Sequence, residues 1–165
     1  MLIHESVEQL LAEPEPLRYL HSILLMAIRD RAERLEIRFG EDSGSLYYRI
    51  KGRDWELLPP PETVYPDLKK VVRSVSRVVS PERPAVTLHA GLEGARFEPL
   101  EVGWLTYQLG AYWLDIVVRI DPREPFGFMQ FDLEQPEEFA ELAGEALDEY
   151  HARLADAPET SIDSE

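Results

Sequence analysis

The sequence contains no cysteine and no long apolar run, and each absence excludes a class of protein. Without cysteine there is no disulfide framework, no thiolate metal site and no cysteine nucleophile. No apolar stretch approaches the ~20 residues that a membrane-spanning helix needs. The N-terminus lacks the basic region followed by an apolar region that marks a signal peptide. We therefore expect a cytoplasmic protein that does not insert into a membrane.

Basic residues are scarce near the C-terminus. Residues 126–165 hold one Lys or Arg against twelve Asp and Glu, whereas residues 1–125 hold sixteen against twenty. Most of the net charge of −15 therefore lies beyond residue 125. A field of this sign repels nucleic acid and anionic lipid, so neither is expected as a partner. The acidity indicates either a well-solvated chain or a basic partner.

Motifs that carry catalysis or bind cofactors are also missing. The sequence has no glycine-rich phosphate loop and no Gly-x-Ser-x-Gly nucleophile elbow. The four histidines are scattered without metal-ligand spacing, and His21 lies beside an apolar helical stripe, where a packing role is expected. We therefore expect no enzyme, no cofactor and no metal site. The four histidines are His4, His21, His89 and His151.

The hydrophobic pattern predicts one α+β domain at residues 1–155 and a disordered acidic tail at 156–165. Apolar spacing of three and four residues indicates helices, and strict alternation indicates strands. The order predicts a single, mainly antiparallel sheet of five to seven strands with flanking helices. The predicted elements are helices at 6–12 and 16–34, three strands within 35–57, a helix at 62–80, three or four strands within 85–120, and a helix at 136–155.

Two predicted hairpins contain all three tryptophans. In the first, a two-residue loop at 52–53 would place Arg49 opposite Glu56. In the second, a turn about 109–110 would place Tyr107 opposite Tyr112. A slip by one residue would mix polar and apolar faces, so the alternation specifies which side chains share a face. The residues gathered on the apolar face of the first hairpin are Tyr48, Ile50, Trp55 and Leu57.

Four basic residues oppose the overall charge. Lys69, Arg73 and Arg77 are spaced four apart on the solvent side of the predicted helix at 62–80, and Lys70 lies beside them. A solvated helix face is the plainer interpretation. The alternative is a surface that grips an acidic partner segment or an anionic ligand.

Three segments in a fixed order carry a family resemblance: LLMAIRDRAERLEIRF, then YYRIKGRDWELLPPP, then LKKVVRSVSRVV. They resemble the domain that precedes the motor in type II secretion and type IV pilus assembly ATPases. Arg49, Ile50 and Gly52 match three positions of that family's Arg-Ile-Asp-Gly motif, and Lys51 replaces the aspartate. The family's ASDIH-like strand keeps only its alanine, at Ala32. GAYWLDIVVRI and FDLEQPEEFAELA are similar to later segments of the family, so the resemblance covers about 17–143.

The resemblance implies a PAS-like antiparallel sheet with flanking helices. In the family this domain packs on the motor of a neighbouring subunit and lends arginines toward its nucleotide, and Arg49 is the residue that carries over. The missing aspartate and the missing phosphate loop point away from catalysis. The resemblance therefore implies a non-catalytic adaptor whose partner is a secretion or pilus ATPase, or its anchor.

A second hypothesis comes from another class of protein. Type III secretion chaperones are similar to this chain in their acidity and in the order helix, three strands, helix, strands, helix. Such chaperones are dimers that hold an effector segment on exposed apolar patches. The adaptor hypothesis predicts a monomer or a weak associate, and the chaperone hypothesis predicts a stable dimer. A regulatory module that binds a small ligand is a third hypothesis.

Overall fold

Two antiparallel three-stranded units lie side by side and form most of the sheet. In the computed structural model, which describes residues 1–79, 100–133 and 137–156, these units are β2–β3–β4 and β6–β7–β8. An antiparallel pairing of β2 with β8 joins them. The strands are β2 (Arg34–Phe39), β3 (Gly44–Ile50), β4 (Arg53–Leu57), β6 (Glu101–Leu109), β7 (Tyr112–Ile120) and β8 (Phe128–Asp132).

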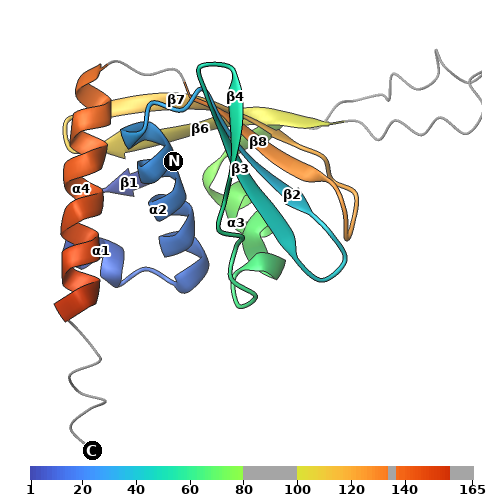
Figure 1. Ribbon diagram of the computed structural model, residues 1–165, viewed down its shortest axis with the longest axis horizontal. Coiled ribbons are helices and arrows are strands. Elements are labelled where there is room, and N and C mark those ends of the chain that lie inside the picture. The colour runs from blue at the N-terminus through green and yellow to red at the C-terminus, as the bar shows by residue number, and fades with distance from the viewer. Residues whose placement is uncertain (80–99, 134–136, 157–165) are drawn as a thin grey trace, which may run out of the picture.

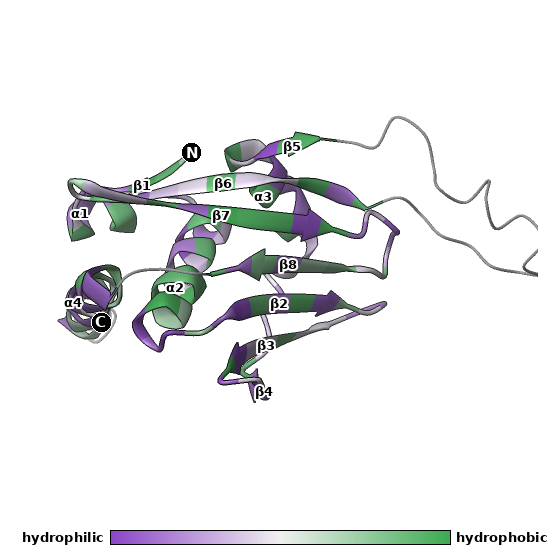
Figure 2. Cartoon of the chain, turned by 90° about the horizontal axis from the view of Figure 1, so that it is seen from above, coloured by the Kyte–Doolittle hydropathy of each residue, from purple (hydrophilic) through white to green (hydrophobic). Residues whose placement is uncertain are grey.

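Two short strands share the free edge of β6. β1 (Leu2–His4) runs parallel to the C-terminal part of β6, and β5 (Arg77–Val79) runs antiparallel to its N-terminal part. The strand order is β1-β6-β7-β8-β2-β3-β4, with β5 beside β6 (Figure 2). Over the described residues the sheet has eight strands, one more than the upper limit of the prediction.

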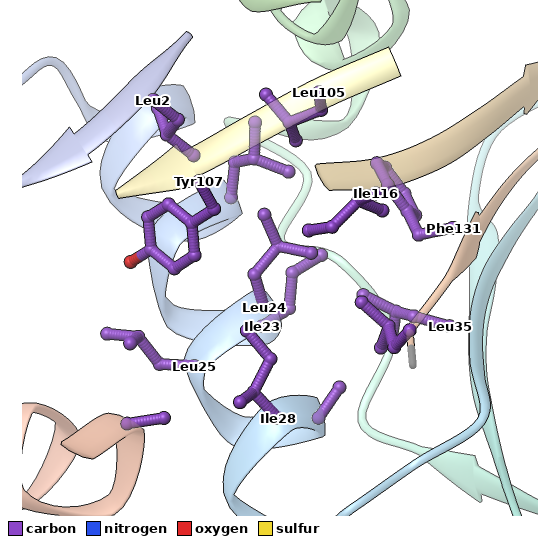
Figure 3. Packing of buried hydrophobic residues seen from close by; sticks show 14 of the residues in the cluster. Leu2, Ile23, Leu24, Leu25, Ile28, Leu35, Leu105, Tyr107, Ile116 and Phe131 are labelled. Atoms are coloured by element: carbon purple, nitrogen blue, oxygen red, sulfur yellow. The ribbon is translucent and has the colours of Figure 1, made fainter. Parts of the chain in front are cut away.

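The helices lie on one side of this sheet (Figure 1). Leu24 and Ile28 of α2 project toward Leu35, Ile116 and Phe131 of the sheet, and all five side chains are buried (Figure 3). Burying a large aliphatic side chain contributes about 1.5–3 kcal/mol, so the packing of α2 on the sheet stabilises the fold substantially. The helices are α1 (Val7–Leu11), α2 (Glu15–Arg29), α3 (Leu68–Val75), preceded by a 3-10 turn (Tyr65–Asp67), and α4 (Glu137–Asp156).

The structure confirms an α+β fold with a mainly antiparallel sheet and flanking helices. The helix predicted at 62–80 is shorter, because α3 ends at Val75 and Ser76 has extended backbone angles. Valine is a poor helix former, and the valines after Ser76 pair with β6 instead. The helix predicted at 16–34 ends at Arg29. The strand predicted at 85–90 and most of the tail lie outside the described residues.

Both hairpins have the predicted faces but a different register. Tyr48 lies opposite Trp55, and Arg49 lies opposite Asp54 rather than Glu56. Tyr107 lies opposite Leu114 rather than Tyr112. Each pairing differs from the prediction by two residues, and a shift of two keeps every side chain on its face. Turn geometry therefore decided the register: the first loop is Lys51–Gly52, where both residues have positive φ, as a type I′ turn requires.

Within residues 1–79, 100–133 and 137–156, no helix is both long enough and apolar enough to cross a membrane.

Candidate protein-interaction face

The sheet face opposite the helices is the outer face. Along β6 the outward residues are Val102, Trp104, Thr106 and Gln108, which alternate with the inward Gly103, Leu105, Tyr107 and Leu109. No outward residue of β6, β7, β8, β2 or β3 is buried. No element of the described chain therefore covers this face.

Exposed apolar side chains gather at one end of the outer face. Trp104 and Trp113 are 48% and 67% exposed, although tryptophan is usually largely buried. The strand register places the group along β6: Ile3 and Trp113 both lie opposite Gln108, and Val79 lies opposite Val102. We call this group the outer patch. It consists of Met1, Ile3, Val79, Val102, Trp104 and Trp113.

A hollow of about 290 Å³ lies within the outer patch, lined by Met1, Arg77, Trp104, Thr106 and Asp115. The Thr106 hydroxyl donates a 2.6 Å hydrogen bond to the Asp115 carboxylate. Arg77 lies opposite Trp104 on the neighbouring strand. Its side chain has no ion pair or hydrogen bond with any residue that the structure describes. A charged, unpaired guanidinium thus stands beside an exposed indole ring.

Close contact between β5 and β6 holds Arg77 in this place. A Cβ atom at Gly103 would lie 2.0 Å from the carbonyl oxygen of Arg77. No real Cβ contact is that short, so only glycine allows β5 to pair with β6 at this point. Gly103 is therefore a positioning residue for the hollow.

The rest of the outer face is a lattice of paired charges. Arg38 contacts Glu36 at 2.6 Å, and Arg49 contacts Asp54 at 2.9 Å. Asp132 lies between two more arginines, Arg34 at 3.4 Å and Arg119. Exposed pairs of this kind contribute little to stability. They neutralise the four arginines, so this part of the face offers no unpaired cation among the described residues.

Arg49, the residue carried over by the family resemblance, belongs to this lattice. Its partner is Asp54, across the β3–β4 ladder, and not Glu56 as the sequence predicted. The hydrogen bond from the guanidinium lowers the pKa of the Asp54 carboxyl. Arg49 is therefore accessible but already paired.

The predicted basic stripe is not a continuous surface. Lys69, expected on the solvent side, is only 5% exposed. Its ammonium donates to the carbonyl oxygens of Arg123 and Phe126, both at 2.7 Å, and to the Glu124 carboxylate at 3.1 Å. Each of the three ammonium protons has an acceptor in the loop between β7 and β8, so Lys69 holds this loop against α3.

The other three members of the stripe have different surroundings from Lys69. Lys70 is exposed on α3. Arg73 contacts Glu101 of β6 at 2.8 Å. Arg77 lies beyond the end of α3, in β5, and its side chain is on the outer face. Of the four residues, only Arg77 lines the hollow.

The sequence contains a signal for the outer patch in the phase of two tryptophans. Trp104 and Trp113 are out of phase with the inward series that contains Leu105 and Leu114, so alternation alone places both indoles on the outer face. β1, which contributes Ile3 to the outer patch, has only three residues, so the sequence shows no alternation that would predict this strand. The pairing of β5 depends on contacts that sequence periodicity does not encode.

A polar cluster lies inside the core behind this face. His21 of α2 is fully buried, and its Nδ1 lies 2.9 Å from the Tyr107 hydroxyl. His4 of β1 is also buried, with its ring 6.2 Å from that of His21. Burial lowers the pKa of His21 to about 4, and the nearby His4 adds to this effect. The packing role expected for His21 is consistent with this position, and no group of metal-ligating side chains was found in the described ranges.

Neither a scan against protein-family models nor a search of curated proteins found a match for this chain. The resemblance to the secretion and pilus ATPases therefore stays a prediction. The inference about function rests on the geometry of the outer face.

Proposed function

We propose that this chain is a non-catalytic protein-interaction domain that binds its partner through the outer patch. The observation that supports this most is the exposure of two indoles, Trp104 and Trp113, together with Arg77, which lies beside Trp104 and has no ion pair or hydrogen bond among the described residues. Tryptophan and arginine are the residue types that dominate binding hot spots. Because β6 and β7 pair along nine residues each, the indoles are presented on a rigid surface that loses little entropy on binding.

The adaptor hypothesis names a folded partner for this surface. On that hypothesis the partner is a secretion or pilus assembly ATPase, or its anchor, and the chain is a monomer or associates weakly. The position of Arg49 within a neutral lattice favours the outer patch over Arg49 as the main contact.

The element order supports a second candidate function. The chain runs α2, three strands, α3, then β5 and three strands, then α4, which is close to the order expected for an acidic type III secretion chaperone. On that hypothesis the chain is a stable dimer, and the outer patch holds an extended segment of an exported protein.

A pull-down from native cell extract with matched variants tests the proposal. Trp104→Ala removes an indole from the outer patch, and Trp55→Ala is the control, because Trp55 is 46% exposed on β4, away from the patch. We expect mass spectrometry to identify a partner with the wild type and with Trp55→Ala, and binding on the order of tenfold weaker with Trp104→Ala.

Equal recovery of that partner by a folded Trp104→Ala variant would contradict a role for the outer patch. The native mass of the bait separates the two candidates. A monomer that recovers an ATPase or its anchor favours the adaptor, and a dimer that recovers one exported protein favours the chaperone.

A further inference from the structure

The hollow at Arg77 offers a cation on a strongly acidic molecule. Its lining contains the Arg77 guanidinium and the Asp115 carboxylate, and the whole chain carries −15. The Met1 ammonium already donates to the Val75 carbonyl oxygen at 2.6 Å. Asp115 already accepts from Thr106. Among the described residues Arg77 has no ion pair or hydrogen bond, so it is the charged group of the hollow that is available to a new partner.

Arg77 also differs from the other arginines of the outer face. Arg34, Arg38, Arg49 and Arg119 all lie against acidic side chains, whereas Arg77 has none among the described residues. Beside it, the indole of Trp104 provides an apolar wall that excludes water when a partner docks. An ion pair becomes stronger in such a place, and a guanidinium can hold a carboxylate through two parallel hydrogen bonds.

We propose that the outer patch binds a protein segment in which an Asp or Glu side chain is flanked by apolar side chains. The carboxylate lies on Arg77, and the apolar neighbours pack on Trp104 and Val102. This inference rests on the proposed function and adds the chemistry of the partner. Since the rest of the molecule is acidic, it repels the same segment elsewhere and restricts it to the outer patch.

A phage-displayed library of random peptides, panned on the immobilised full chain, tests this inference. Peptides that also bind Trp104→Ala are removed by counter-selection. Among the remaining peptides we expect enrichment of Asp and Glu next to apolar residues. A synthetic copy of the tightest peptide should lose on the order of tenfold in affinity when its acidic residue is replaced by the amide.

Reversing the charge of Arg77 on the protein is the complementary test. Arg77→Glu should weaken binding of the acidic peptide by at least the same factor, on the order of tenfold. The same variant should bind more tightly a peptide in which Lys replaces the acidic residue. Lys70→Glu is the control, because it makes the same change of charge at an exposed position of α3, outside the outer patch, and it should leave binding nearly unchanged. Circular dichroism verifies that both variants are folded.

The outcomes separate this inference from the proposed function. Peptides that depend on Trp104 but lack acidic enrichment, or that bind Arg77→Glu as tightly as wild type, would overturn the inference and leave the interaction function standing. Failure to recover any peptide that depends on Trp104 would contradict both. A wild-type dimer that Arg77→Glu dissociates would show that a second copy occupies the patch, and would also overturn the inference.

Discussion

At the scale of single residues, a few backbone positions carry strain that the sequence did not reveal. Lys51 has φ of 52° and precedes Gly52 with φ of 76°. A left-handed conformation costs an ordinary L-residue roughly 1–2 kcal/mol, and Asn tolerates it better than Lys. Lys51 replaces the aspartate of the resembled motif, which would also suit this turn. The left-handed conformation of Lys51 therefore destabilises the hairpin.

Lys51→Asn should stabilise the protein, because Asn-Gly is the preferred pair for a type I′ turn. We expect the free energy of unfolding to rise by up to about 1 kcal/mol, measured by urea denaturation. Lys70→Asn, which replaces an exposed lysine within a helix, serves as the control and should not stabilise. An unchanged or lower midpoint for Lys51→Asn would argue against strain in this loop.

At the scale of elements, the edge of β6 is the decisive feature. β1 and β5 occupy its two halves and bring Ile3, Arg77 and Val79 to the outer face. β5 can approach only because Gly103 has no side chain. The outer patch is thus built from three distant parts of the sequence, and its integrity depends on one glycine.

Gly103→Ala should displace β5, because the new methyl group would collide with the backbone at Arg77. We expect a loss of about 1–3 kcal/mol of stability, as for other overpacked sites, and faster amide hydrogen exchange in Arg77–Val79. The amides of β1, at the other half of the same edge, are the internal control and should keep their protection. Unchanged exchange in β5 would contradict this account of Gly103.

At the scale of the whole molecule, the core encloses two histidines that must stay neutral. His21 from α2 and His4 from β1 meet beside Tyr107 of β6, and Glu149 of α4 faces His4. Burial lowers the pKa of both histidines, against a smaller opposite effect of Glu149 on His4. Because these groups join the N-terminal strand to two helices and the sheet, their protonation affects the fold as a unit.

Stability should fall as the pH is lowered from 6.5 to about 4. In this window an unfolded histidine binds a proton that buried His21 does not, so the unfolded state is favoured as the pH drops. The shift of His21 alone corresponds to a loss on the order of 3 kcal/mol. His21→Gln should flatten this dependence in urea denaturation across the window, whereas the exposed His151→Gln should not. Parallel pH profiles for wild type and His21→Gln would exclude His21 as the cause.

The local pattern of the sequence determined the α+β class, the helices α2 and α4, and the face of each hairpin residue. These features follow from spacings of two to four residues, which a sequence displays directly. The tertiary structure alone decided the hairpin registers, the pairing of β5, the burial of Lys69 and the assembly of the outer patch. The hairpin registers depend on the backbone geometry of the turns. The other three depend on contacts between segments far apart in the chain, such as Lys69 with Phe126 or Gly103 with Arg77. Periodicity places a side chain on a face, but only the packed sheet decides what lies beside it.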